Sequence, residues 1–396
     1  MSNLSFFYFI TLLLFNYIHS VQCQTLYFAG DLSNITLDGN TVIDSSKWIQ
    51  VANYESFSLA YWPFLGGISS DKLFFATSSS YGTSAVVSIV AYDTTLNKWV
   101  TNSSITGNPG QTFLNFEAWI TDRSTGKAYS LQYISNIIEI FDTVNYAWAN
   151  SSVIPQTYQT YVSTYLSTLY GPPQVLLPSG IILYFASESS SSIISSTTTS
   201  MGNILSYNIK ANSWQFINTT GQIPSLRTDY TAVSVSDGRV IIYGGTSNTL
   251  AASPSIVVLN TSNYVWSAPS EVNPIGPLTQ HTSVIVNNFM IAAFGINATD
   301  KNILTQNNKN IYKLDVSDPL TYKWSVLSIY KDLTTSKNKT KVEDYIPTAG
   351  SNREMDYCEM NYIPTAGSNR EMDYIPTPGS NREMGYIPTP GSKGVI

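Results

Sequence analysis

Tryptophan returns along this chain at a nearly constant interval, and this interval constrains the fold more than any other feature. The six repeating residues are Trp48, Trp99, Trp148, Trp214, Trp266 and Trp324, with gaps of 51, 49, 66, 52 and 58 residues. Five of them close the same phrase, in which an apolar run is followed by Asp or Asn and then by tryptophan. The polar residues of these phrases are Asp93, Asp142, Asn208, Asn260 and Asp315. A period near 50 residues is typical of proteins that repeat one supersecondary unit.

Each unit can be divided into four short strands, most clearly in the unit that ends at Trp266. Residues 228–236 alternate apolar and polar side chains, as in a half-buried strand, and Asp237-Gly238 is a two-residue hairpin signal. Residues 239–243 form an apolar strand that is followed by Gly244-Gly245. Strand-forming units at this period predict a β-propeller.

These residues resemble the kelch repeat. Its features are a glycine doublet after an apolar strand, here Gly244-Gly245, then Asp or Asn after the next strand, and tryptophan six residues later. The resemblance covers about residues 24–330 and implies an all-β, kelch-type β-propeller of six, or seven, four-stranded blades. Glycine permits close backbone approach, Asp or Asn caps a tight turn, and tryptophan packs one blade on the next. We therefore expect the repeat residues to have structural roles.

Ring closure can be predicted from the first unit. It starts at residues 24–30, which have the pattern of a second strand and not of a first. We expect the missing inner strand to come from the chain after Trp324. Residues 323–333 would then supply an outer strand and part of the closure.

The first 23 residues have the pattern of a secretory signal peptide. Residues 6–15 form an apolar core of ten residues, which is too short to span a bilayer. No later apolar stretch has membrane length, so we expect a secreted protein without a transmembrane span. Seven Asn-x-Ser/Thr sites are candidates for N-glycosylation. They are Asn34, Asn102, Asn150, Asn218, Asn260, Asn297 and Asn338.

The predicted propeller occupies residues 24–333, and a different kind of sequence follows it. Residues 334–396 contain a 12-residue repeat, in which Tyr-Ile-Pro-Thr recurs. Such a repeat buries little surface per unit, so we expect a disordered tail. A Ser-rich insert at residues 187–200 is expected to loop out of its blade.

Composition and motifs exclude several classes of function. The net charge of −6, without a basic stripe, argues against nucleic acid. The kelch resemblance suggests the galactose oxidase and glyoxal oxidase enzymes, whose copper site needs two His and two Tyr, one of them cross-linked to Cys. Only His281 lies outside the predicted signal, and no Cys lies in the propeller. We therefore expect no cofactor, no metal and no enzyme activity.

The remaining functional signal is aromatic. Four tyrosines crowd one connection between blades: Tyr158, Tyr161, Tyr165 and Tyr170. They are a candidate binding loop, although filling the space between blades is the alternative role. The leading hypothesis is non-catalytic binding of a protein or glycan partner through loops on one propeller face. Two alternatives stay open, a degenerate extracellular oxidase and a wall or matrix protein that binds through its tail.

Overall fold

The structure of the protein is a computed structural model. The structure describes residues 12–16, 23–28, 33–38, 49–50, 62–68, 71–78, 87–100, 105–107, 118–133, 135–166, 172–187, 200–298, 308 and 310–329. All of them belong to the compact unit Met1–Lys341, and a second unit comprises Val342–Ile396. The predicted tail lies outside the described residues.

Strands dominate the described part of the chain, and most of them form four-stranded antiparallel meanders. The first sheet has β1 (Leu12–Asn16), β2 (Cys23–Phe28), β3 (Ser33–Asp38) and β4 (Ile49–Gln50). The next has β5 (Trp62–Gly66), β6 (Lys72–Ser78), β7 (Val87–Asp93) and β8 (Lys98–Val100). It is followed by β9 (Trp119–Asp122), β10 (Lys127–Gln132), β11 (Ile137–Asp142) and β12 (Ala147–Asn150).

Two helical turns separate this sheet from the next one. They are α1 (Gln156–Tyr161) and the π-helical turn η2 (Val162–Leu166). The following meander has β13 (Gln174–Leu176), β14 (Ile181–Tyr184), β15 (Asn203–Asn208) and β16 (Ser213–Asn218).

The last two sheets have five strands each. One has β18 (Thr231–Ser234), β19 (Arg239–Tyr243), β22 (Ile256–Asn260), β23 (Val265–Ser267) and the added β17 (Thr220–Gly221). The other has β26 (Thr282–Val286), β27 (Phe289–Ala293), β29 (Asn310–Asp315), β30 (Thr321–Ile329) and the added β24 (Ser270–Val272). Short ribbons pair β20 (Thr246–Ser247) with β21 (Leu250–Ala251), and β25 (Leu278–Thr279) with β28 (Ile296–Asn297).

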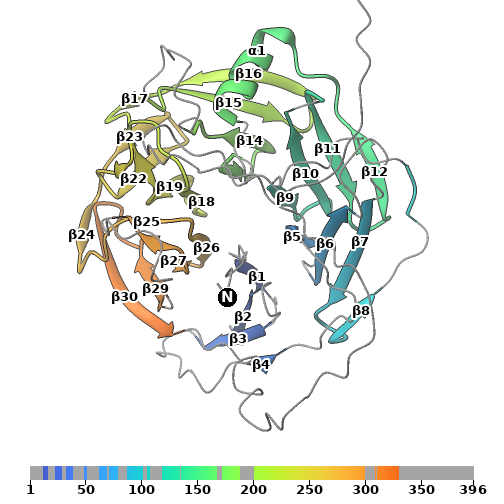
Figure 1. The fold of residues 1–396 in the computed structure, drawn as a ribbon, viewed down its shortest axis with the longest axis horizontal. Coiled ribbons are helices and arrows are strands. Elements are labelled where there is room, and N and C mark those ends of the chain that lie inside the picture. The colour runs from blue at the N-terminus through green and yellow to red at the C-terminus, as the bar shows by residue number, and fades with distance from the viewer. Residues whose placement is uncertain are drawn as a thin grey trace, which may run out of the picture. The chain divides into compact units, whose positions relative to one another are not determined.

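The sheets follow one another around a ring within the unit Met1–Lys341 (Figure 1). Each inner strand contacts the inner strand of the next sheet, from β5 to β9, β13, β18 and β26. The strand β26 in turn contacts β1. This arrangement is a β-propeller, and it confirms the predicted all-β fold class.

The structure describes the side chains of five blades, where the sequence predicted six or seven. Five sheets with described side chains form four-stranded blades, namely β5–β8, β9–β12, β13–β16, β18–β23 and β26–β30. The strands β1–β4 supply one further four-stranded sheet, whose side chains are not described. The packing between blades is therefore described for five of them.

The inner strand of this further sheet has an unexpected origin. The chain after Trp324 was expected to supply it, but β1 pairs antiparallel with β2 at this position. The expected outer strand is present, because β30 carries Trp324 on the outer edge of its own blade. The strand β1 lies inside the segment predicted to be a signal peptide.

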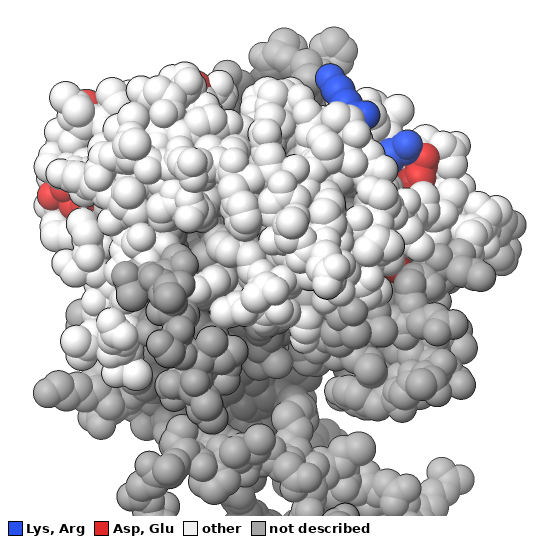
Figure 2. Space-filling model, turned by 90° about the horizontal axis from the view of Figure 1, so that it is seen from above, with Lys and Arg blue, Asp and Glu red and all other residues white. Residues whose placement is uncertain are grey.

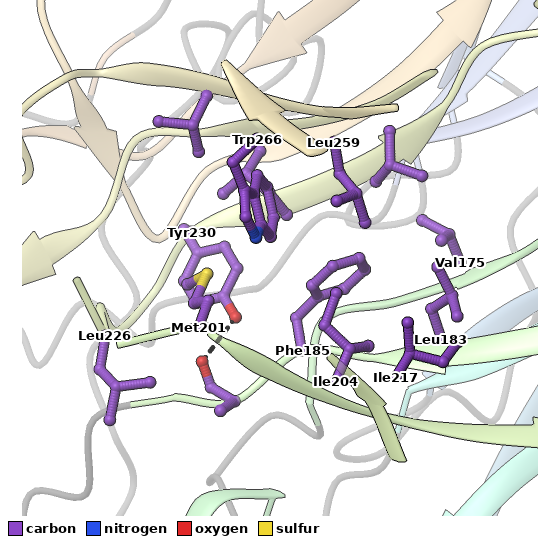
Figure 3. Packing of buried hydrophobic residues seen from close by; sticks show 14 of the residues in the cluster. Val175, Leu183, Phe185, Met201, Ile204, Ile217, Leu226, Tyr230, Leu259 and Trp266 are labelled. Carbon is purple, nitrogen blue, oxygen red and sulfur yellow. Dashed lines mark hydrogen bonds between the residues drawn. The ribbon is translucent and has the colours of Figure 1, made fainter. Parts of the chain in front are cut away.

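The hydrophobic core lies between the blades and not within one central mass. One cluster joins β13–β16 to β18–β23 and packs Leu183 and Phe185 against Leu259 and Trp266 (Figure 3). Clusters of the same kind join the other neighbouring blades with described side chains. Alternate residues of each strand face opposite neighbours, so each of the three blades β9–β12, β13–β16 and β18–β23 contributes to two of these clusters.

The repeated tryptophans lie on the outer strands. Trp99, Trp148, Trp214, Trp266 and Trp324 belong to β8, β12, β16, β23 and β30, whereas Trp48 lies outside the described residues. In the four clusters between blades, the indole faces the preceding blade, as Trp266 does in Figure 3. A large flat side chain at this place covers the sheet of its neighbour.

The Asp and Asn residues of the repeat end the third strands and cap the following turns. Asp93, Asp142, Asn208 and Asn260 each accept backbone hydrogen bonds through Oδ1, and Asp315 does so from Ser317. The side chain thus satisfies donors that the tight turn leaves without a strand partner.

Candidate functional site

The outer edge of three blades is covered in the same way. A short piece of the connection that leads into the blade, before its inner strand, pairs in parallel with the outer strand of that blade, and we call such a piece a strap. Straps are formed by Thr106 on β12, by β17 on β23 and by β24 on β30. An outer strand exposes unpaired backbone groups, so a strap protects it from unwanted pairing.

The blade β13–β16 differs from this pattern. Its preceding connection approaches the outer strand at Ser152, whose N–H and hydroxyl both donate to Asn212 Oδ1. The chain then turns at Pro155 and forms α1 and η2, and no parallel strand pairs with β16 among the described residues. A helical segment, Gln156–Leu166, thus replaces the strap, and we call it the rim segment. Figure 1 shows α1 at the periphery of the ring, beside β16.

The local sequence explains why the rim segment is helical. Pro155 stands before the first turn, where its missing N–H is no loss, and the backbone N–H of Tyr158 donates to its carbonyl. Val162 and Leu166, four residues apart, fall on one face and are buried against the blades β9–β12 and β13–β16. This apolar contact anchors the segment.

The structure brings together three of the four tyrosines that the sequence singled out. Tyr161 lies 5.0 Å from Tyr165 between ring centroids. Phe216 of β16 joins them, with its ring 5.2 Å from Tyr158 and 4.9 Å from Tyr161. Tyr170 lies outside the described residues. Phe216 was not singled out from the sequence, because no pattern along the chain links β16 to the rim segment.

The tyrosines fix the rim segment to the blade. The hydroxyl of Tyr158 donates to the carbonyl of Trp214 at 3.2 Å, and that of Tyr161 to Asn203 at 2.8 Å. Burial raises the pKa of Tyr161 well above its usual value, so the phenol stays neutral. These rings therefore act mainly as anchors, and the solvent meets Gln156, Thr157, Thr160 and Ser163 instead.

The repeat tryptophan of this blade has a buried donor without a partner, unlike those of the next two blades. Trp266 Nε1 donates to Thr219, and Trp324 Nε1 donates to Glu271, residues that lie in or next to the strap of each blade. Trp214 Nε1 is buried without a hydrogen-bond partner. The rim segment offers no polar side chain where the strap would have placed one.

The surroundings of the rim segment are uncharged. It contains no charged residue, and the described connections between blades contain only Arg227, Asp229 and Glu271, which are buried or half-buried. Most described charges lie instead at the tight turns of the blades. Figure 2 views the molecule from the edge that carries α1 and β16 in Figure 1, and most of the described surface there is uncharged.

Three polar side chains, His281, Thr231 and Ser283, meet between the blades β18–β23 and β26–β30. Nε2 of His281 is 2.9 Å from the hydroxyl of Thr231, which donates to Ser283. Burial lowers the pKa of His281 to about 3, so the imidazole is neutral at pH 7. Its ring packs edge-on against Tyr243. This buried histidine has a structural environment.

Arg227 and Asp229 lie near the start of the inner strand β18. Arg227 is fully buried and donates to the carbonyl of Gly244, and burial lowers its pKa. Burial also raises the pKa of Asp229. Neither residue has a neighbouring metal-ligand set, since no group of three His, Cys, Asp or Glu could hold a metal among the described residues.

The candidate glycosylation sites that can be located are all exposed. The side chains of Asn150, Asn218, Asn260 and Asn297 reach solvent at strand ends. The side chain of Asn34, in β3, is not described, and Asn102 and Asn338 lie outside the described residues. No described helix is long and apolar enough to cross a membrane.

A family model described as the KLHDC2/KLHL20/DRC7 Kelch-repeats domain matches residues 192–359. The matched region includes β18–β23 and β26–β30, where the glycine doublet and two of the repeat tryptophans lie. No curated protein matches the chain.

Proposed function

We propose that this β-propeller, whose residues 192–359 match a kelch-repeat model, is a kelch-repeat propeller that binds a partner protein through the rim segment and the loops beside it. Kelch propellers are typically protein-binding scaffolds without catalytic activity. A propeller suits this task because rigid blades hold variable loops in fixed positions.

One observation favours the rim segment as the binding site. Of the four blades β9–β12, β13–β16, β18–β23 and β26–β30, whose preceding connections are at least partly described, the other three have a strap, whereas here a helix replaces it and Trp214 Nε1 lacks a partner. A departure from the repeat that costs stability is typical of functional positions. The segment is also well anchored, so it can present Thr157 and Thr160 to a partner with little loss of conformational entropy.

A neutral partner surface fits this site. The exposed side chains are hydroxyls and amides, which recognise a partner by hydrogen bonding and not by charge. A glycan is the second candidate ligand, because hydroxyl and aromatic side chains also suit sugars. An oxidase activity has less support, since His281 is buried and neutral. The tail-binding alternative concerns residues outside those described.

Secretion and N-glycosylation belong to the same proposal, on the strength of the leader sequence and the exposed sequons. Residues Leu12–Asn16 have two competing roles, because they lie in the predicted signal peptide and also form β1. Either the segment is cleaved during secretion, or it stays and completes the first sheet. One mature protein cannot have both. The N-terminal sequence of the purified protein decides between them: a start after Cys23 or Ser20 supports secretion, whereas a start at Met1 contradicts it.

Site-specific photo-crosslinking tests the binding site. A photoreactive residue replaces Thr160 on α1 or, as the control, Thr95 in the turn after β7, where both positions are exposed threonines. Each protein is irradiated in an extract of its source. We expect a discrete adduct from position 160 and none from position 95, and Thr160→Arg should weaken binding of the identified partner about tenfold. Adducts from position 95 alone, or from neither position, would contradict the proposal.

A further inference from the structure

Two outer strands end in the same five-residue phrase. It consists of an aromatic residue, any residue, Asn, any residue, and Ser or Thr. The phrase is Trp148–Ser152 at the end of β12 and Phe216–Thr220 at the end of β16. Each phrase contains one sequon, and its aromatic residue precedes the sequon asparagine by two positions.

Strand geometry places the aromatic ring and the asparagine on one face. Side chains two residues apart point to the same side of a strand, and β16 pairs regularly with β15 through Asn218. A sugar linked to Asn218 therefore starts on the side of the sheet that carries Phe216. The two side chains lie within reach of one monosaccharide because alternate residues are about 7 Å apart.

The structure distinguishes two sites that the sequence does not. Phe216 is 39% exposed, although it is a large apolar residue at the end of an outer strand. Trp148 is only 8% exposed, and its ring packs on Phe141 and Trp119. Hence only Phe216 has an open surface on which a sugar could pack.

The neighbourhood of Phe216 suits a neutral sugar. Tyr158 and Tyr161 meet its ring at steep angles and hold it in place. The other exposed side chains of β16 are neutral, and the edge of the molecule beside it carries few charges (Figure 2). Carbon–hydrogen faces of sugars pack on aromatic rings, while their hydroxyls bond to neutral polar groups.

We propose that Asn218 carries an N-linked glycan whose first N-acetylglucosamine packs on Phe216 and covers it. This inference rests on the proposed passage through the secretory pathway. In the transfer step, a bond forms between Nδ2 of Asn218 and C1 of the sugar. The bond from C1 to the phosphate oxygen of a diphospholipid donor breaks, the diphospholipid leaves, and the amide loses one proton to the transferase.

Glycopeptide analysis and thermal unfolding test the proposal. The full chain is secreted from a eukaryotic host with a host leader, so that the result does not depend on its own signal. One endoglycosidase trims the glycan to a single sugar, and an amidase removes it completely. We expect an occupied Asn218, an unchanged Tm after trimming, and a fall of about 2 °C after complete removal.

Two matched variants identify the cause of the shift. Phe216→Ser should abolish the difference between trimmed and bare protein, because it removes the ring. Asn218→Gln keeps the other six sequons, and in this variant trimming and removal should give the same Tm, because Trp148, the aromatic residue two positions before Asn150, is buried.

Two results would overturn the inference: an unmodified Asn218 beside other occupied sequons, or an equal shift in Phe216→Ser. A chain that reaches the medium with the host leader but stays in the cell with its own leader would contradict secretion instead. The two proposals can therefore fail separately.

Discussion

Glycine at position 244 occupies a place that no other residue fits. Its φ of 74° is in the left-handed region, and a Cβ there would lie 2.1 Å from the carbonyl oxygen of Leu278. Gly276 has a similar φ of 79°, but its nearest atom would be 3.9 Å away. Both positions share the strain of a positive φ, but only position 244 adds a steric clash. Comparing alanine substitutions at the two positions therefore separates the two costs.

We expect Gly244→Ala to lower the free energy of unfolding by about 3 kcal/mol or more, and Gly276→Ala by about 1–2 kcal/mol. Urea denaturation of both variants measures the difference. Equal losses would show that the clash is relieved by a shift of the neighbouring blade.

Burial of His281 makes stability depend on pH. The unfolded imidazole takes up a proton near pH 6.5, whereas burial lowers the native pKa to about 3. The unfolded chain binds more protons between these values, so stability is lost as the pH falls below about 6.5. The raised pKa of Asp229 has the opposite effect at lower pH, because there the native state binds more protons and the protein gains stability as the pH falls.

The prediction is clearest between pH 5.5 and 6.5, above the range of carboxylates with ordinary pKa values. The wild-type protein should lose up to about 1.4 kcal/mol per pH unit through His281. In His281→Asn this loss should be absent, although the variant is less stable at pH 7. Parallel pH profiles for the two proteins would mean that His281 is protonated in the native state.

At the scale of elements, a strap and the rim segment differ in whether they supply a hydrogen-bond acceptor to the repeat tryptophan of their blade. Trp266 Nε1 donates to Thr219 at 2.9 Å, but Trp214 Nε1 has no partner. Both side chains are buried and both lie on outer strands. Replacement by phenylalanine removes a similar apolar volume at each site.

We expect Trp266→Phe to cost about 1–2 kcal/mol more than Trp214→Phe, because only the first loses a hydrogen bond, while the second removes an unsatisfied donor. Chemical denaturation gives both values. A larger loss at Trp214 would imply that an ordered water serves Nε1 in solution.

At the scale of the whole molecule, the ring is expected to end with β30. This strand contributes Tyr322 and Trp324 to the cluster between the last two blades, and it ends at Ile329. Removal of all residues after Leu333 should therefore preserve a cooperative thermal transition with an unchanged midpoint. Removal from Asp318 onward deletes β30 and should abolish that transition. A tail deletion that also abolishes it would place part of the fold beyond Leu333.

Much of the fold could be predicted because its signals are local. The hairpin at Asp237-Gly238 and the buried strand Arg239–Tyr243 follow from alternation and turn chemistry. The inner strand of the first sheet could not be found in this way. Leu12–Asn16 is a short apolar run, and such a run fits a signal core as well as a buried strand.

The candidate binding site could likewise be predicted only in part from the sequence. The crowding of Tyr158, Tyr161 and Tyr165 is visible along the chain, but their role as anchors depends on carbonyls of β15 and β16. Phe216 could not be singled out, since its partners lie more than fifty residues away in sequence.

The sequence by itself determined the repeat, the strand units and the propeller architecture, because period, turn residues and alternation are properties of neighbouring residues. Only the tertiary structure decided which blade lost its strap, which indole lost its partner, and which of two phrases of the same pattern has an exposed ring. These depend on burial, and burial is set by elements that meet only when the ring has formed.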